Sequence, residues 1–494
     1  MTTSNLPAPS NFNYKQRWLL VGLAALAYLL RLHRLNVESF WFDEALTALF
    51  ALQPLPVAIQ SMLQEGLHHT PLFYILLRLF VSDAFSEFSI RFLPAVLGVL
   101  AVPLIAQLGR SLVNVRVGLL TALLLVINPF HLWYSRETRA YTFLMLIALG
   151  SMFFFSQNLK ASRFRNWAAM AVFTAMGING HHFAFFIPLI QFVFIIVTFK
   201  RNYVLLRPWG VAQLFVALSF VPWTLIVLNW GNFYLSSAAV DRPVLYDLFQ
   251  TFWNFSVGYT VHLTLVTILT LFFFLLLLGL GINHTYRTDK GLFLILWLII
   301  PPVVAFLVSF RLPTYMDRYL IQSLPPFLLL TAIGITTIRW QALSLAAAAL
   351  AVTLMLGGVY RVYYDTQIYD RADWRSLAAY LEAHATADDV IAPWYYQALV
   401  SLYFYYHGAT PFEPIISFDK VALPAYSSPG QARSRRIWVI IEYPNNSSHQ
   451  TGHCQPFDEQ NLAGLPEAKE WRASQQSRLQ ERIDFTCLRL ELYQ

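Results

Sequence analysis

Charge is the scarcest feature of this sequence. Only 12% of its 494 residues are Asp, Glu, Lys or Arg, whereas 57% are hydrophobic and the mean hydropathy is +0.50. Soluble domains carry about twice that share of charge and could not bury so much apolar surface. The sequence therefore predicts a polytopic membrane protein. The net charge is +7, but the basic residues form no stripe, which excludes nucleic acid as a partner. The excess of Lys and Arg is instead expected in cytoplasmic loops, which are positively charged in membrane proteins.

Cysteine and nucleotide-binding motifs are also scarce. The two cysteines, Cys454 and Cys487, lie near the C-terminus. They could form a disulfide outside the cytoplasm or stay as separate thiols, and the spacing leaves both open. The chain has no Walker loop, no GxGxxG and no Ser-His-Asp arrangement. This excludes an enzyme that carries a soluble nucleotide-sugar fold.

Apolar runs of roughly bilayer length indicate about eleven membrane spans. Lys and Arg flank alternate ends of these runs, which predicts a cytoplasmic N-terminus. The predicted spans are Trp18–Leu35, Phe92–Leu108, Val117–Leu132, Ala140–Phe155, Ala168–Asn179, Phe183–Thr198, Val211–Asn229, Leu263–Leu280, Leu292–Phe310, Tyr319–Ile338 and Ala342–Gly357.

The remaining parts of the chain are not expected to span the membrane. Residues 44–53 and 55–65 and the short run Thr70–Val81 indicate interfacial helices in the first outer loop. Residues 359–494 are richer in charge and turns. A helix capped by Asp373 and two apolar strands predict a small extracytoplasmic α/β domain there, after a transmembrane domain at 1–358.

Ionisable residues gather on the face that this topology places outside the cytoplasm. They come from five separate loops, which a helical bundle would bring together, and such residues beside a membrane indicate a functional site. They are Asp43, Glu44, His68, His69, Arg91, Arg136, Glu137, Arg139, His181, His182, Arg311, Asp317 and Arg318.

Each group also has a plainer interpretation. Asp43 and Glu44 could be the N-cap and first-turn acid of a surface helix. The pairs His68–His69 and His181–His182 could mark the membrane boundary. Alternatively, His69 and His182 could hold a divalent metal ion with Glu44, although the spacing is not that of a tight metal motif.

The combination favours one reaction class. A carboxylate could accept a proton from an acceptor hydroxyl, while arginines bind the phosphate that leaves from a lipid-borne sugar. Aromatic side chains could pack on the sugar and the lipid chain. The stretch from Trp133 to Tyr141, which includes Tyr134, supplies several of these residue types.

Three stretches carry a family resemblance: "FWFDEALTALFA", "HHTPLFYILLRLF" with the following "SEFSIRFLPAVLGVLAVPLIAQLGRSL", and "INPFHLWYSRETRAYTFLMLIALGS". They resemble the C-type (GT-C) lipid-linked-sugar glycosyltransferases of the protein O-mannosyltransferase and aminoarabinose transferase superfamily. The resemblance extends over residues 17–200 and more weakly to about 340. It is closest to the bacterial members that are like the dolichyl-phosphate-mannose-protein mannosyltransferases.

The resemblance implies a function and roles for these residues. Asp43 would be the catalytic base beside Glu44, and Arg91 would match the arginine that closes the loop. Arg91, Arg139 and Arg318 would bind the lipid phosphate, and Glu137 would face the site. His69 and Thr70 stand before Pro71 where the aminoarabinose enzymes have Glu-Lys, which is closer to the mannosyltransferase-like members. The partners would be a polyprenyl-phosphate sugar, an acceptor and membrane lipids.

Two other functions fit part of the pattern. A transporter or lipid flippase would also be polytopic, but the sequence has no internal repeat and its charges lie at one face instead of the midplane. A sugar-lipid-binding scaffold would need no base. The sugar and the acceptor are not determined by these residues.

Overall fold

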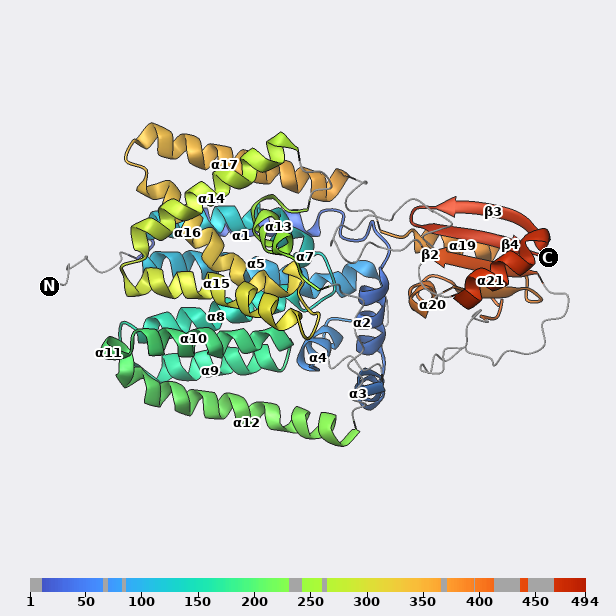
Figure 1. Cartoon of the computed structure of the whole chain (residues 1–494), viewed down its shortest axis with the longest axis horizontal. Coiled ribbons are helices and arrows are strands. Elements are labelled where there is room, and N and C mark those ends of the chain that lie inside the picture. The colour runs from blue at the N-terminus through green and yellow to red at the C-terminus, as the bar shows by residue number, and fades with distance from the viewer. Residues whose placement is uncertain are drawn as a thin grey trace.

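The computed structural model of the chain describes residues 11–64, 70–81, 86–230, 242–259, 264–365, 371–394, 396–412, 436–442 and 466–494. A helical bundle is followed by a small α/β domain at one end (Figure 1). The helices of the bundle are α1 (Tyr14–Leu32), α5 (Glu87–Leu112), α6 (Val115–Val126), α7 (Pro129–Ser135), α8 (Tyr141–Asn158), α9 (Phe164–Ile178), α10 (Phe186–Val197), α11 (Phe199–Asn202), α12 (Leu206–Trp230), α13 (Leu245–Val257), α14 (Leu265–Thr285), α15 (Asp289–Ser309), α16 (Leu324–Thr337) and α17 (Gln341–Tyr364), with 3₁₀ turns η1 (His182–Phe185), η2 (Tyr203–Leu205) and η3 (Asp317–Ser323).

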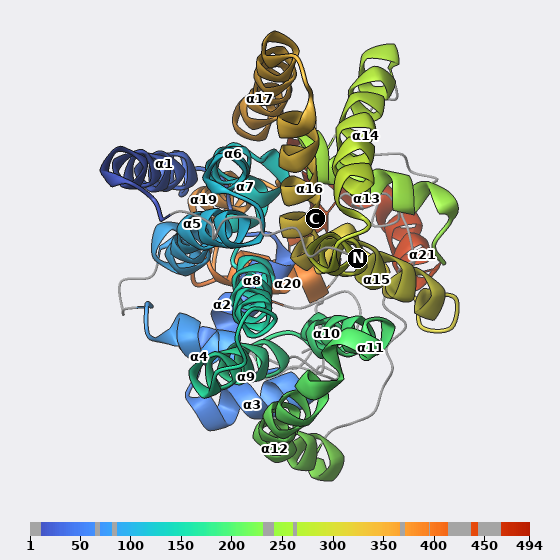
Figure 2. The same ribbon diagram turned by 90° about the vertical axis from the view of Figure 1, so that its left-hand side faces the viewer.

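A helix occupies each of the eleven predicted spans. Among the described residues, seven helices are long and apolar enough to cross a membrane, or eight when α6 and α7 count as one bent span. The helical membrane fold is confirmed, while the number of eleven spans stays a prediction. Helices α12, α14 and α17 lie at the outside of the bundle (Figure 2) and expose apolar side chains such as Leu218 and Leu269, as lipid-facing helices do.

The span expected over Val117–Leu132 is broken instead of straight. Helices α6 and α7 meet at an angle of 58°. The Asn128 side chain accepts a hydrogen bond from the His131 backbone N–H at 2.9 Å and so begins a new helix, with a proline at its first position. Arg31 of α1 donates to the Val126 carbonyl that the break leaves open (3.4 Å) and lies 2.7 Å from Nδ1 of His131.

The first outer loop forms three short helices, as predicted. They are α2 (Phe42–Leu52), α3 (Leu55–Gln64) and α4 (Leu72–Arg78), and they lie between the bundle and the α/β domain in Figure 1. Between the predicted spans Val211–Asn229 and Leu263–Leu280, residues Leu245–Val257 form a further helix, α13, which was not predicted. The Asp247 carboxylate accepts from the Val244 N–H at 2.7 Å and stabilises the start of that helix.

The C-terminal part contains the predicted helix and strands. Helix α19 (Trp374–His384) is capped by Asp373, whose side chain accepts from the Ser376 N–H. The other elements are β1 (Val390–Pro393), α20 (Tyr396–Tyr403), β2 (Ile437–Glu442), α21 (Pro466–Gln475), η6 (Gln476–Arg478), β3 (Leu479–Phe485) and β4 (Leu488–Tyr493). The strand order is β1-β2-β4-β3, with β1 and β2 parallel and the other pairs antiparallel.

A disulfide belongs to this sheet. Cys487 lies in the turn between β3 and β4 with a positive φ of 63° and is disulfide-bonded. Cys454 is the other cysteine of the sequence and lies outside the described residues.

Two glycines let α14 and α16 approach closely. A Cβ at Gly281 would lie 1.9 Å from the Leu330 carbonyl oxygen, and one at Gly334 would lie 1.9 Å from the Leu277 carbonyl oxygen. Small residues at a helix crossing allow this backbone contact within a membrane. Gly279, on the same helix as Gly281, has open space around it.

We expect Gly281→Ala to destabilise the protein by about 1–3 kcal/mol, because α16 must move away from the new methyl group. Gly279→Ala is the matched control, and it should leave stability equal or slightly raised because Ala favours the helix. Thermal unfolding of the purified protein in detergent measures both. Equal unfolding temperatures for the two variants would contradict the close crossing.

Candidate functional site

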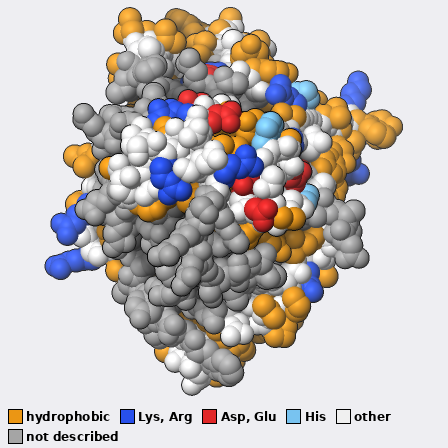
Figure 3. Space-filling view, turned by 90° about the vertical axis from the view of Figure 1, so that its right-hand side faces the viewer, with side chains coloured by type: hydrophobic (Ala, Val, Ile, Leu, Met, Phe, Trp, Pro, Cys, Tyr) orange, Lys and Arg blue, Asp and Glu red, His pale blue; other side chains and the backbone are white. Residues whose placement is uncertain are grey.

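The site is built around the first turn of α2, at the end of the bundle that faces the α/β domain. Figure 3 looks onto the molecule from the side of the α/β domain, where acidic, basic and histidine side chains of the described residues lie close together on the surface. Asp43 and Glu44 both lie in the first turn of α2, where acidic residues favour the helix dipole. Trp41 is the N-cap residue, so the alternative that Asp43 caps the helix is wrong.

Glu44 is fully buried and its carboxylate is occupied. Oε1 accepts from Nε of Arg91 at 2.9 Å and from the Thr138 N–H at 2.9 Å, while Oε2 accepts from Nη2 of Arg91 at 2.7 Å. Arg371 donates to the same Oε2. Burial alone would raise the pKa of Glu44, but the positive charges of Arg371 and Arg91 hold it below its usual value. Glu44 is therefore an ionised residue that connects three segments.

Arg91 has no donor left for a ligand phosphate. Its Nη1 donates to the carbonyl oxygens of Leu35 (3.0 Å) and Glu38 (2.9 Å), and its Nη2 donates to that of Ser39 (3.2 Å) as well as to Glu44. With Nε also bound to Glu44, all five guanidinium N–H groups have an acceptor. Arg91 therefore holds the outer loop in its conformation through these contacts. This role differs from the phosphate binding that the resemblance implies.

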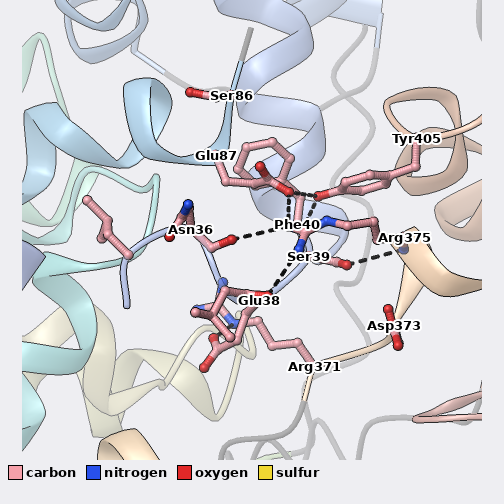
Figure 4. Close-up of polar contacts among 12 residues, drawn as sticks. Asn36, Glu38, Ser39, Phe40, Ser86, Glu87, Arg371, Asp373, Arg375 and Tyr405 are labelled. Atoms are coloured by element: carbon pink, nitrogen blue, oxygen red, sulfur yellow. Dashed lines mark hydrogen bonds and ion pairs between the residues drawn. The ribbon is translucent and has the colours of Figure 1, made fainter. Parts of the chain in front are cut away.

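The α/β domain is joined to this loop by a second set of polar contacts (Figure 4). Arg375 of α19 pairs with Glu87 at the start of α5 and donates to the Asn36 carbonyl at 3.2 Å. The Tyr405 hydroxyl donates to Glu87 at 3.1 Å and accepts from the Phe40 N–H at 2.7 Å. The loop before α2 is thus held between the bundle and the domain.

Asp43 has a different setting from Glu44. Its side chain is 22% exposed, and its nearest cation is Nη2 of Arg139 at 3.6 Å. Nη1 of Arg139 donates to the Thr47 hydroxyl at 3.1 Å. Arg318, at the start of η3, interacts electrostatically with Asp43 and lies over the Trp41 ring at 5.8 Å. The carboxylate is open to a ligand and stands beside two cations.

Aromatic rings form the wall beside these cations. The Tyr141 ring lies 6.2 Å from that of His181 and 6.1 Å from that of Tyr319, measured between centroids. Burial, together with the positive charges of His182 and Arg139, lowers the pKa of His181 to about 3. His181 is therefore neutral at physiological pH and contributes packing or hydrogen bonding instead of charge.

Glu137 is a second buried carboxylate of the site. Burial and, to a smaller extent, the negative charge of Glu44 raise its pKa to about 7, although the positive charge of Arg371 opposes the shift. Its Oε1 has no hydrogen-bond partner within the described structure, and neither has the Tyr141 hydroxyl nor Nε of Arg318. A buried polar atom without a partner costs stability, and these three belong to residues that interact with one another and, for Glu137 and Arg318, with Asp43, so a ligand bound there could supply the missing bonds.

Other predicted residues lie elsewhere. The Tyr134 hydroxyl is bonded to that of Tyr259, beside the buried Asp317, whose carboxylate accepts from Asn254 at 2.5 Å. Arg136 donates to the Arg34 carbonyl at 3.0 Å and lies over the Tyr363 ring. His182 and Arg311 are exposed, whereas His68 and His69 lie outside the described residues.

The sequence prediction missed Arg371, Thr47, Tyr74 and Tyr319. Arg371 stands seven residues beyond the end of α17, and no pattern in the sequence connects it with Glu44. Tyr319 directly follows Arg318 and could have been found as part of the same short motif. Burial raises the pKa of Tyr74 to about 12, so its hydroxyl stays protonated near Asp43 and Arg139.

The predicted metal site lies only partly within the described residues, because His69 is outside them. No group of three His, Cys, Asp or Glu side chains converges within the described residues. Glu44, the carboxylate expected as a ligand, has its oxygens bound by Arg91, Arg371 and Thr138. We derive no catalytic step through a metal ion.

Arg91→Lys tests the structural position of Arg91. Lysine has three donors on one nitrogen and cannot reach the five acceptors, so we expect a loss of about 3 kcal/mol in stability. Arg78→Lys, in the exposed part of α4, should leave the unfolding temperature unchanged. An Arg91→Lys protein of normal stability that binds the donor more weakly would instead make Arg91 a phosphate ligand.

Glu137 should make stability depend on pH. Because its pKa is higher in the folded state, the folded state holds more protons between about pH 4.5 and 7. The free energy of unfolding should fall by up to about 3 kcal/mol as pH rises through this window, then stay level. Glu137→Gln should remove the fall, and exposed Glu481→Gln should keep it. Thermal unfolding from pH 5 to 8 measures this, and parallel curves for wild type and Glu137→Gln would contradict it.

Comparison with known proteins adds a family and a fold. Residues 68–226, about a third of the chain, match the family described as dolichyl-phosphate-mannose-protein mannosyltransferase. No curated protein matches the sequence.

Solved structures match over much more of the chain. ArnT from Cupriavidus metallidurans in the apo state is 12% identical with a TM-score of 0.63, covering 97% of this chain and 98% of that one. The same protein bound to undecaprenyl phosphate has a TM-score of 0.60 at 11% identity, with the same coverage. The oligosaccharyltransferase AglB from Archaeoglobus fulgidus, in complex with an inhibitory peptide and a dolichol-phosphate, is 12% identical with a TM-score of 0.52 over 80% of this chain and 64% of that one. The family match and this shared architecture confirm the resemblance seen in the sequence: the chain has the C-type fold of the membrane glycosyltransferases that use lipid-linked sugars.

Proposed function

We propose that this protein transfers a sugar from a polyprenyl phosphate to an acceptor hydroxyl, with Asp43 as the general base. The observation that carries the proposal is the contrast between the two acids of α2. Glu44 is buried and fully bonded, whereas Asp43 is partly exposed, with cations beside it. A base must be reachable by the proton that it removes, and only Asp43 of this pair meets that condition.

The arrangement supports an inverting displacement. The Asp43 carboxylate would accept the proton of the acceptor hydroxyl as its oxygen attacks the anomeric carbon. The bond from that carbon to the phosphate oxygen would break on the opposite face, and the lipid phosphate would leave with one more negative charge. Arg139 and Arg318 stand where they could stabilise this charge, because each interacts electrostatically with both Asp43 and Tyr141.

The unpartnered atoms support the same assignment for the phosphate. Nε of Arg318 and the Tyr141 hydroxyl are buried donors without acceptors in the described structure. A phosphate oxygen would provide the missing acceptor for each. Glu137, with its pKa of about 7, is protonated in part of the molecules at neutral pH and could then donate to the same phosphate instead of repelling it.

The acceptor would enter at the seam with the α/β domain. A cavity of about 320 Å³ lies there, lined by Arg34, Ser39, Tyr363, Tyr364, Arg375 and Thr486. Tyrosine rings and charged groups that can donate and accept hydrogen bonds suit a hydroxyl-rich ligand. Arg371 lines the cavity and also contacts Glu44, so the seam adjoins the site. The Lys and Arg distribution in the loops supports an extracytoplasmic position for both.

The test is transfer from a panel of radiolabelled polyprenyl-phosphate sugars by the purified full chain. We expect Asp43→Asn to lower turnover at least about 100-fold while donor binding stays normal, because the amide cannot accept the proton. Asp388→Asn, an exposed acid in the α/β domain, is the matched control and should keep full activity. Normal turnover by Asp43→Asn would reject Asp43 as the base. Donor binding with no transfer by wild type would favour a flippase or a scaffold.

A further inference from the structure

A basic pocket lies at the other end of the bundle. It has a volume of about 540 Å³ and lies where α8 ends and α9 begins, at the end that faces the viewer in Figure 2. Its walls include Phe153, Phe154, Gln157, Lys160, Arg163 and Arg165. The catalytic loops precede α8, at the opposite end of the same helix, so this pocket is separate from the site around Asp43.

The pocket carries positive charge that none of the described residues lining it neutralises. Three of its lining residues are cations, and no carboxylate lines it among the described residues. Partial burial lowers the pKa of Lys160, and the nearby charges of Lys290 and Arg110 lower it further. Asp289, an acid near this end, is paired with Arg201 at 2.8 Å. Like charges gathered in a hollow repel one another, so an anion bound there would relieve an existing cost.

The pocket wall is held in place by hydrogen bonds. Nζ of Lys160 donates to the Ser111 carbonyl at 2.5 Å, and Nε2 of Gln157 donates to the Ser111 hydroxyl at 3.2 Å. The Asn158 side chain accepts from the Arg163 N–H at 3.2 Å and fixes the turn into α9. The cations therefore stand on an ordered turn attached to the end of α5.

Apolar rings adjoin the cations on one side. The Phe153 and Phe154 rings lie 5.2 Å apart in an edge-to-face arrangement, and Phe154 packs on Phe173 at 5.8 Å. Both belong to the last turns of α8, one turn inside the cations. A ligand that fits has an anionic head at the level of the loop and an apolar chain along the helices.

We propose that this pocket binds the phosphate head group of an anionic phospholipid from the leaflet at this end of the bundle. The cations and the adjoining phenylalanine rings together favour a lipid over a soluble phosphate, because a soluble anion would make no contact with the rings. Basic pockets between helices at a membrane surface bind such head groups. This inference does not depend on the transfer reaction.

The experiment measures binding of phosphatidylglycerol and phosphatidylcholine to the detergent-purified full chain by native mass spectrometry. We expect wild type to retain phosphatidylglycerol in preference to phosphatidylcholine. Lys160→Gln/Arg163→Gln/Arg165→Gln should weaken phosphatidylglycerol binding about fivefold for each cation removed. Lys200→Gln/Arg287→Gln/Arg339→Gln removes the same charge from exposed positions at the same end and should change binding little.

Three results would overturn the proposal. Equal loss of phosphatidylglycerol in the two triple variants would show that charge acts diffusely and not through the pocket. Equal retention of both lipids by wild type would show no selection for an anion. Competition by millimolar inorganic phosphate as strong as that by phosphatidylglycerol would show a soluble anion site. Arg163→Gln/Arg165→Gln, which leaves Lys160 and its bond to Ser111 intact, keeps the test valid if the triple variant does not fold.

Discussion

The buried pair of Glu44 and Arg91 is the contact on which the arrangement of the site depends. A carboxylate and a guanidinium are both costly to remove from water, and they persist only when every donor and acceptor has a partner. Here the acceptors come from α2 and from the loop that precedes it, and further donors come from Thr138 and Arg371. A single ion pair thus brings together the first outer loop, the 136–139 turn, α5 and the segment before α19. Asp43, one residue from Glu44, takes its position from this cluster.

The two acids of α2 illustrate how one local sequence provides both structure and chemistry. Adjacent residues on a helix point about 100° apart, so one can enter the core while its neighbour stays partly exposed. The buried acid is ionised because two arginines surround it, and the exposed acid keeps access to a ligand. A third carboxylate, Glu137, lies between these extremes with a raised pKa. Three acids in one small volume thus have three different electrostatic settings.

Much of the fold could be predicted from the sequence because the bilayer limits the choices. Apolar runs gave the positions of the helices, and the short run at Thr70–Val81 was too short to span, as α4 is. The break at Asn128 was not predicted, since an apolar run looks the same whether its helix is straight or bent. Local cues were present in the Asn-Pro pair, which ends one helix and begins another.

The candidate site could be predicted only in part. Loop residues of the right chemistry were found, and the structure brings Asp43, Glu137, Arg139, Tyr141, His181 and Arg318 together. The sequence did not show which of these residues are buried and which are accessible to a ligand, because burial depends on contacts between distant segments. Arg91 looked like a phosphate ligand by its place in the loop, yet its five donors are used by carbonyls that only the folded loop presents. Arg371 is 327 residues from Glu44, and no motif or periodicity in the sequence connects the two.

The broken span has a consequence for how the protein is made. Arg31 lies in α1, but the carbonyl of Val126 and the ring of His131 that receive its guanidinium are synthesised 95 and 100 residues later. A lone guanidinium is expensive in hydrocarbon, and Arg31 is one residue before the end of α1, where a long side chain can reach the lipid head groups. The guanidinium of Arg31 would stay among these head groups until α6 and α7 are inserted. The contacts of Arg31 are therefore completed only when α6 and α7 are in place, so the packing of α1 depends on helices that are made after it.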